Sequence, residues 1–138
     1  KYPIMNKKFH KFKQYFFRPN KNSISIRIKY KMKYIWISNL HLSCDVTGYQ
    51  QNQQINEFIE TINFKESNII CGDFNSLMNY KCFKKLREKM KNGFIGKTFP
   101  SIFPLYQLDY VLYNDINNLK VEKLKTNLSD HIPLLIEL

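Results

Sequence analysis

The sequence has few cysteines and no long apolar run. Its three cysteines, Cys44, Cys71 and Cys82, form no C-x-x-C pair. An odd, scattered set of this kind argues against a disulfide framework or a zinc knuckle and favours a reducing, intracellular compartment. No apolar stretch approaches the roughly 18 residues that a membrane-spanning helix needs, and the start, Lys1 to Ile4, does not resemble a secretory signal. We therefore expect a soluble chain without a transmembrane segment.

Arginine is scarce as well, although the chain is strongly basic. The 138 residues carry 19 lysines, 3 arginines and 11 acidic residues, which gives a formal net charge of +11. Such an excess indicates a polyanionic partner, either nucleic acid or an anionic membrane. The 15 asparagines and 16 isoleucines point instead to an AT-rich coding bias, and phosphate recognition commonly uses the bidentate guanidinium of arginine. The charge therefore favours nucleic acid only slightly.

The apolar pattern predicts one domain, residues 1–138, in which strands alternate with two helices. In the first helix, Ile55, Phe58, Ile59 and Ile62 recur at the spacing of one helix face. Residues 98–104 are expected to form an irregular loop and 114–118 a turn, while the first twenty residues show no readable pattern. The order indicates an α/β or α+β fold. Strands are predicted over 24–29, 33–38, 68–71, 108–113, 119–125 and 132–138, and helices over 50–62 and 79–91.

Polar clusters interrupt the apolar pattern at four predicted strand edges. Most have an ordinary explanation by themselves, because Gly, Asp, Asn and Ser form turns and a histidine can end a strand. Asp109 is different, since an unpaired carboxylate inside an apolar strand is costly and needs a partner. Together the clusters supply three carboxylates, two imidazoles and two carboxamides, which suit metal-assisted attack on a phosphate. The clusters are Asn39-Leu40-His41-Leu42, Gly72-Asp73-Phe74-Asn75, Leu108-Asp109-Tyr110 and Ser129-Asp130-His131.

In this order the clusters resemble the N-x-H-L, G-D-F-N, hydrophobic-D-Y and S-D-H motifs of the endonuclease/exonuclease/phosphatase superfamily. Lys1-Tyr2-Pro3-Ile4 and Thr98-Phe99-Pro100-Ser101 are similar to two further segments of that superfamily. The resemblance implies a DNase I-like four-layer sandwich, in which two sheets pack face to face. It also implies that this chain covers roughly the C-terminal half of such a domain.

The resemblance assigns a catalytic role to His131, either as general base or as a stabiliser of the pentacovalent phosphate. Asp109 would then hold the imidazole of His131 in one tautomer. Asp73 is expected to bind metal or position the attacking water, and Asn75 to orient it.

The resemblance also assigns residues to the phosphate and to a second metal contact. Asn39 and His41, with Asn75, are expected to contact phosphate oxygens, and His41 is a candidate for protonating the leaving group. Asp130 is the expected further metal carboxylate beside Asp73 and Asn75. The implied cofactor is Mg²⁺, with Mn²⁺ as an alternative, because the donors are mainly oxygen atoms.

Two features of the superfamily are missing upstream of the Y-P-I segment: an asparagine on a first strand and a later glutamate, the principal metal ligand. Glu57, Glu60 and Glu66 lie on or after the first predicted helix, in the wrong place to substitute for that glutamate. We therefore expect the N-terminal half of the domain to be absent from this chain. Weak metal binding and little activity are expected from the chain by itself.

The leading interpretation is Mg²⁺-dependent hydrolysis of a phosphodiester, with nucleic acid favoured over phospholipid as substrate. One alternative is a sphingomyelinase-like lipid phosphodiesterase. Another is a catalytically inactive basic module, derived from the same fold, that binds RNA or a protein.

Overall fold

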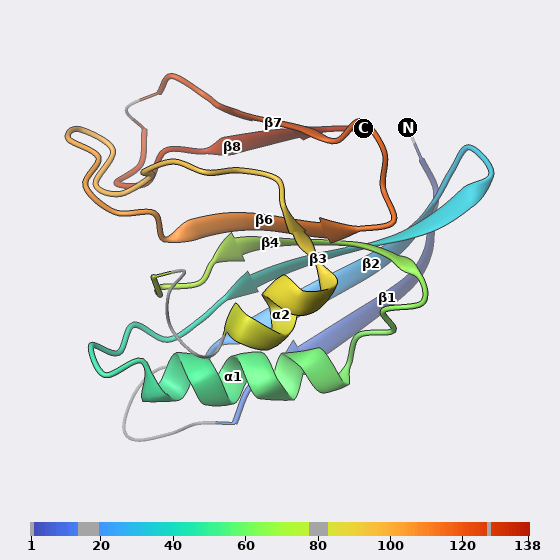
Figure 1. Cartoon of the computed structure of the whole chain (residues 1–138), viewed down its shortest axis with the longest axis horizontal. Coiled ribbons are helices and arrows are strands. Elements are labelled where there is room, and N and C mark those ends of the chain that lie inside the picture. Colours follow the sequence, from blue (N-terminus) through green and yellow to red (C-terminus); the bar gives the residue numbers. More distant parts are fainter. Residues whose placement is uncertain (1, 14–19, 78–82, 127) are drawn as a thin grey trace.

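The computed structural model describes residues 2–13, 20–77, 83–126 and 128–138. It contains a six-stranded sheet with the order β1-β2-β3-β4-β6-β5 and a separate sheet of β7 and β8 (Figure 1). The elements are β1 (Ile4–Lys11), β2 (Asn22–Tyr30), β3 (Lys33–His41), α1 (Tyr49–Glu60), β4 (Ser67–Asp73), α2 (Lys84–Lys89), β5 (Lys91–Asn92), β6 (Asp109–Asn114), β7 (Lys120–Lys123) and β8 (Leu134–Glu137). The mixture of strands and helices confirms the predicted fold class.

The direction of the strands determines where the site lies. β3 and β4 run parallel and are connected through α1, whereas the other neighbouring strands of the large sheet are antiparallel. A parallel pair needs a crossover connection, which α1 supplies. The C-terminal ends of β3 and β4 therefore reach the same edge of the sheet, where antiparallel β6 begins (Figure 1).

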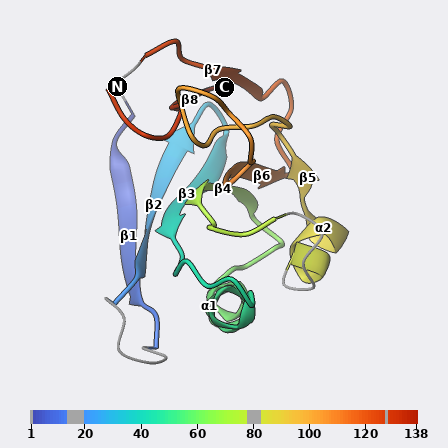
Figure 2. The same ribbon diagram turned by 90° about the vertical axis from the view of Figure 1, so that its left-hand side faces the viewer.

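Two hydrophobic cores cover the two faces of the large sheet. Figure 2 shows α1 and α2 on one side of it and β7 and β8 on the other. The helix-side core includes Ile55, Phe58, Ile70 and Tyr110, and the core between the sheets is built around Ile35, Ile69 and Val111. The described residues thus form three layers of the expected four-layer sandwich.

Most predicted elements are confirmed, with shifted ends. Ile55 and Phe58 of α1 are buried, as the predicted helix face requires. The end of the second helix differs from the prediction, which placed it at residue 91. Met90 adopts extended backbone angles, φ −134° and ψ 146°, so α2 ends at Lys89 and Lys91–Asn92 pairs with β6 instead. Residues 79–82 of that predicted helix lie outside the described residues.

Strand β1 was not predicted, because it carries little of the alternation that marks a half-buried strand. It lies at the edge of the sheet and pairs only with β2, and Ile4, Met5 and Phe9 are exposed. Cross-strand hydrogen bonds rather than burial therefore hold it. None of the described helices is both long enough and apolar enough to cross a lipid bilayer.

Candidate active site

Three of the predicted site residues stand side by side on adjacent strands. In the sheet register His41 of β3 lies opposite Asp73 of β4, and Asp73 lies opposite Asp109 of β6. Asn39 lies two residues earlier on β3, opposite Cys71. Because alternate residues of a strand share a face, all of these side chains project from the face that is packed against β7 and β8.

Asp109, which was expected to need a partner, is paired with His131. The Nδ1–H of His131 donates to Oδ2 of Asp109 at 2.7 Å, and the two side chains are 24% and 17% exposed. Burial lowers the pKa of the His131 imidazole, but the hydrogen bond and the charge of Asp109, with the charges of Asp73 and Asp130, outweigh it. The pKa of His131 is consequently raised above its ordinary value.

The loop that contains Ser129 to His131 is fixed by the irregular segment predicted at 98–104. The backbone N–H of Ser101 donates to the carbonyl of Asp130 at 2.7 Å, and its hydroxyl donates to the carbonyl of Ser129 at 2.6 Å. The ring of Phe99 packs against the His131 imidazole, with 4.8 Å between the ring centroids. This segment therefore orients His131 in addition to connecting two strands.

Asp73 and Asn75 form a closed turn at the end of β4. The backbone N–H of Asn75 donates to Oδ1 of Asp73 at 2.8 Å, and its side-chain amide donates to Oδ2 at 3.0 Å. The same amide also donates to the carbonyl of Leu42 at 3.0 Å, which connects the turn to the end of β3. Burial, helped by the charge of Asp109, raises the pKa of Asp73, and the hydrogen bond from Asn75 only partly offsets this.

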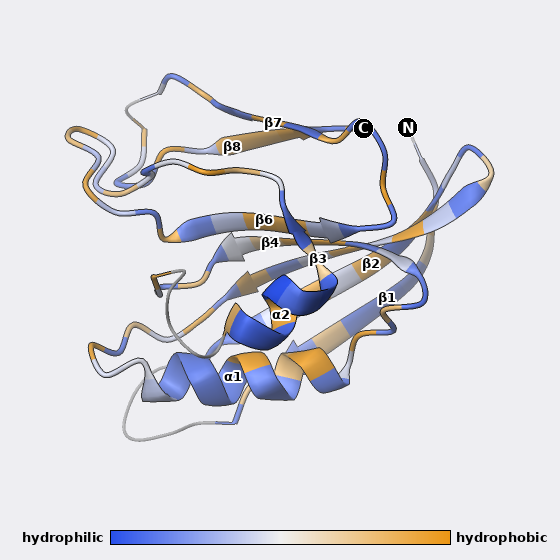
Figure 3. Cartoon of the chain, viewed as in Figure 1, coloured by the Kyte–Doolittle hydropathy of each residue, from blue (hydrophilic) through white to orange (hydrophobic). Residues whose placement is uncertain are grey.

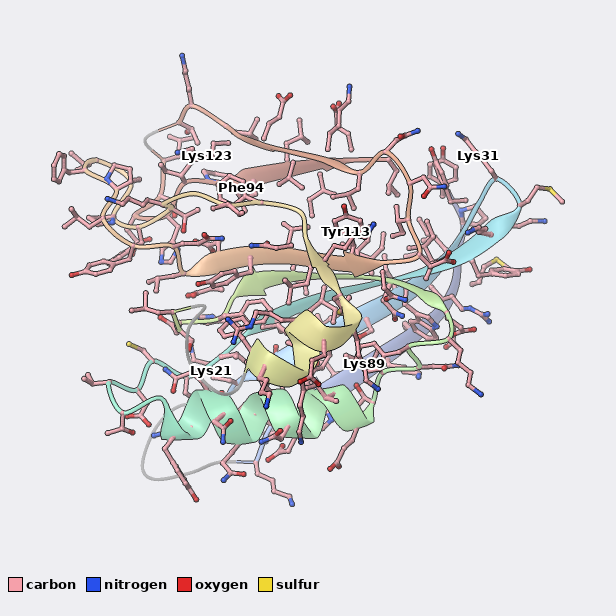
Figure 4. All side chains as sticks on the ribbon, viewed as in Figure 1. Lys21, Lys31, Lys89, Phe94, Tyr113 and Lys123 are labelled. Atoms are coloured by element: carbon pink, nitrogen blue, oxygen red, sulfur yellow. The ribbon has the colours of Figure 1, made fainter. Side chains whose placement is uncertain are left out.

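His41 lies between a carboxylate and an ammonium group. Its Nε2 is 3.5 Å from Oδ2 of Asp73, and the ammonium of Lys21 donates to the same nitrogen at 2.8 Å. Lys21 is labelled in Figure 4. Burial and then the charge of Lys21 lower the pKa of His41, against the opposing effect of Asp73. A neutral His41 that accepts a hydrogen bond from Lys21 is a weaker candidate for protonating a leaving group than the sequence suggested.

Sequence reasoning missed Lys21 and two glutamines of α1. The side-chain amide of Gln51 donates to the carbonyls of Asp45 at 3.0 Å and Asn75 at 2.9 Å, and Oε1 of Gln54 accepts from the N–H of Ser43 at 2.9 Å. Both glutamines are buried, so α1 holds the loops that follow β3 and β4. Polar residues on the apolar face of a predicted helix were the available signal, whereas nothing in the sequence marked Lys21.

The structure brings Asp73, Asp109 and His131 into one group, whose candidate ligand atoms lie within 4.8 Å of one another. Asn39 joins Asp109 and His131 in lining an adjacent cavity of about 340 Å³. Asp130 is exposed and lies outside the three-residue group, although its charge acts on His131.

Two of the three glutamates that the sequence argument set aside are engaged elsewhere in the fold. Glu66 accepts hydrogen bonds from Arg27 and Trp36, each at 2.6 Å. Glu57 lies 3.6 Å from His10 and accepts from the backbone of Lys13. Neither residue belongs to the group at the strand ends.

Replacing Lys21 by methionine is expected to raise the pKa of His41. The substitution keeps most of the aliphatic length and removes the positive charge that disfavours a protonated imidazole. NMR titration of the histidine ring protons measures the change, with Lys31→Met at the distant β2–β3 hairpin as the control. An unchanged His41 titration would show that the ammonium does not act on the ring in solution.

No protein-family model matches the sequence, and no curated protein matches it. Solved structures do match. A mannosyl-6-phosphatase from Bacteroides thetaiotaomicron aligns with 99% of this chain and 67% of its own, at a TM-score of 0.81 and 15% identity. An endonuclease/exonuclease/phosphatase from Bacteroides vulgatus aligns with 100% of this chain and 67% of its own, at a TM-score of 0.82 and 16% identity. A conserved protein of unknown function from Enterococcus faecalis aligns with 99% of this chain and 66% of its own, at a TM-score of 0.83 and 15% identity.

This chain thus spans about two thirds of the length of these solved proteins. The TM-scores show a shared fold, but identities of 15–16% do not carry the activity of these proteins over to this chain. The structure therefore confirms the resemblance at the level of fold: the chain has the DNase I-like fold of the endonuclease/exonuclease/phosphatase proteins.

Proposed function

We propose that this protein hydrolyses phosphodiesters by metal-assisted, in-line attack of water. The observation that carries the proposal is the 2.7 Å hydrogen bond between His131 and Asp109, placed beside the buried carboxylate of Asp73. A histidine oriented by a carboxylate is suited to act as a general base, and an adjacent carboxylate of raised pKa favours a cation. The His131–Asp109 pair lines a cavity at the strand ends, and Asp73 lies beside it.

The hydrogen bond assigns the tautomer of His131. With the proton of Nδ1 directed to Asp109, the lone pair of Nε2 is available to take a proton from water. Phe99 and the backbone of Ser101 restrict movement of the ring and its loop. His131 would thus act as the base, and Asp109 would stabilise the imidazolium that forms.

Asp73 and Asn75 are the residues that would hold Mg²⁺, with Asp130, which lies outside the three-residue group, as the further carboxylate. Asp73 fits a cation because burial raises the pKa of its carboxylate, and a nearby positive charge would relieve that cost. When bound, the ion supplies charge stabilisation at the phosphate and lowers the pKa of coordinated water. Because Asp109 is already engaged by His131, the described residues offer few free carboxylates, and we expect weak binding by this chain alone.

Asn39 and His41 complete the proposed site on the β3 side. Asn39 lines the cavity that Asp109 and His131 also line, at a position suited to a phosphate oxygen. The ammonium of Lys21 next to His41 adds positive charge where a phosphate would approach. We assign Asn39 and His41 to phosphate binding.

The fold supports hydrolysis of a phosphoester. A mannosyl-6-phosphatase and the catalytic domain of human Nocturnin are among the similar structures, the latter at a TM-score of 0.74 and 16% identity, with 99% of this chain and 60% of Nocturnin's aligned. The basic binding module remains the second candidate, and the net charge of +11 favours it. That module gives no reason for the contact between Asp109 and His131.

The proposal is tested by two measurements on the longest form of the protein that folds. Mn²⁺ is expected to broaden the NMR signals of His131 and His41 in the wild type and not in Asp73→Asn, because Asp73 is the buried carboxylate of the group. Mg²⁺-dependent hydrolysis of DNA, RNA and phospholipid is then measured for the wild type and for His131→Ala. The matched control is His10→Ala, a histidine on the edge strand β1.

Hydrolysis that requires Mg²⁺, persists in His10→Ala and disappears in His131→Ala would establish the assignment. Hydrolysis that survives His131→Ala unchanged would refute it. Metal-independent binding of RNA, without hydrolysis of any of the three substrates, would favour the binding module.

A further inference from the structure

The end of the molecule that holds the candidate active site exposes large apolar side chains. Four of the exposed apolar side chains in the described loops at this end are at least 70% exposed: Val46 is 93% exposed, Ile102 92%, Phe103 70% and Leu128 95%. We call these four residues the apolar rim. Single exposed apolar residues are common, whereas several in the loops that surround one site suit an interaction surface.

Hydrogen bonds place these loops around the site. Ser101, which directly precedes Ile102 and Phe103, bonds to the carbonyls of Ser129 and Asp130 and so brings both residues beside Leu128. On the other side, Val46 follows Asp45, whose carbonyl accepts from the same amide of Gln51 that holds Asn75. Figure 3 shows hydrophobic segments in loops at the left end of the molecule, where β3 and β4 terminate.

A basic groove adjoins the apolar rim. It has a volume of about 770 Å³ and is lined by Ser101, Leu124, Thr126, Ile132 and the exposed lysines Lys123 and Lys125. Lys123 is labelled in Figure 4. The loops at this end also carry two carboxylates, Asp45 and Asp130, but neither lines the groove, whose charged lining residues are Lys123 and Lys125.

We propose that the apolar rim and the basic groove dock the active site onto an anionic phospholipid bilayer, whose phosphodiester headgroups are the substrate. This inference rests on the proposed function. Apolar side chains next to lysines are the composition of interfacial membrane anchors: the apolar groups enter the headgroup region, and the lysines bind anionic lipid.

The same composition disfavours nucleic acid as the partner of this surface. Single strands bind to aromatic side chains on which bases stack, and three of the four rim residues are aliphatic. Aliphatic side chains gain little from a phosphate backbone and much from leaving water. The lysines alone would suit either polyanion, so the apolar rim decides between them.

The test is binding of the full chain to phospholipid vesicles, followed by sedimentation. Vesicles of phosphatidylcholine with phosphatidylglycerol are compared with vesicles of phosphatidylcholine alone. The rim variant is Ile102→Ser with Phe103→Ser, and the matched control is Met32→Ser, which is 94% exposed at the β2–β3 hairpin. All three positions are exposed, so the fold is expected to be preserved, and circular dichroism checks this.

The rim variant is expected to bind mixed vesicles about tenfold more weakly than the wild type, because two inserting side chains are lost. Met32→Ser should bind like the wild type. Lys123→Gln with Lys125→Gln should weaken binding to the mixed vesicles and leave the small binding to neutral vesicles unchanged.

Equal binding by the wild type and the rim variant, or no binding to mixed vesicles, would overturn the inference. Binding of single-stranded DNA that is steep in salt and unaffected by the rim variant, in place of vesicle binding, would assign the end of the molecule to nucleic acid. A wild-type dimer that dissociates in the rim variant would assign the rim to self-association and also overturn it. Vesicle binding without Mg²⁺-dependent hydrolysis of the headgroups, measured on the longest form of the protein that folds, would refute the headgroups as substrate. If that form also hydrolysed neither DNA nor RNA, the proposed function would fail while the docking surface stayed established.

Discussion

Replacing Gly72 by alanine is expected to destabilise the protein by more than about 3 kcal/mol, or to prevent folding. Gly72 has a φ of 131°, a conformation that other residues rarely adopt. An added Cβ would lie 2.0 Å from the carbonyl oxygen of Leu40 and 2.9 Å from its backbone nitrogen. These are backbone atoms of β3, so they cannot rotate away, and β3 and β4 would have to separate.

The measurement is urea unfolding, with Gly96→Ala as the matched control. A Cβ at Gly96 would lie 2.9 Å from the ring edge of Phe94, which is a side chain that can shift, so a cost of about 1 kcal/mol is expected. If Gly72→Ala unfolds at the same urea concentration as the control, the close approach of β3 and β4 is wrong. Because this approach sets His41 opposite Asp73, the site depends on it.

Replacing Asp109 by asparagine is expected to lower the pKa of His131 and to reduce phosphodiester hydrolysis by about 10² to 10⁴. The hydrogen bond and the negative charge of Asp109 both favour the charged imidazole, and asparagine removes the charge. An amide that donates its N–H would also favour the wrong tautomer of His131. The control is Asp115→Asn, an exposed carboxylate bonded to Lys33 and Ser67 at the other end of β6.

The pKa of His131 also has a consequence for stability. Its folded pKa is raised above the ordinary value of 6.5, so its contribution to stability is complete below that pH and is lost as the pH rises through the folded pKa. This loss should be smaller in Asp109→Asn. NMR titration of His131 and urea unfolding at about pH 5 and about pH 9 measure both effects. A His131 pKa that is identical in the wild type and Asp109→Asn would contradict the predicted coupling.

The candidate site was predictable to a large extent because its residues occur in short motifs at strand ends. Asp109 was expected to have a partner because an unpaired carboxylate inside an apolar strand is costly, and His131 is that partner. The spacing of Ile55 and Phe58 predicted the buried face of α1 for a similar reason. Each of these conclusions depends on the cost of burying one residue, which the local sequence reveals.

Other features depend on contacts between segments that are distant in sequence. Lys21 meets His41 only because β2 pairs with β3, and Ser101 holds the loop of His131 through Ser129, which is 28 positions away in the sequence. Strand β1 carries no clear pattern, because its edge position needs hydrogen bonds and little burial.

The sequence by itself therefore determined most of the strands and both helices, without β1 and β5, together with the motifs and the charge, because composition and periodicity are local properties. Only the tertiary structure decided that Asp73, Asp109 and His131 meet, that burial and Lys21 keep the pKa of His41 low, and that exposed apolar loops surround the site. The physical reason is that pKa values, hydrogen-bond partners and exposed surface depend on the neighbours that folding brings together.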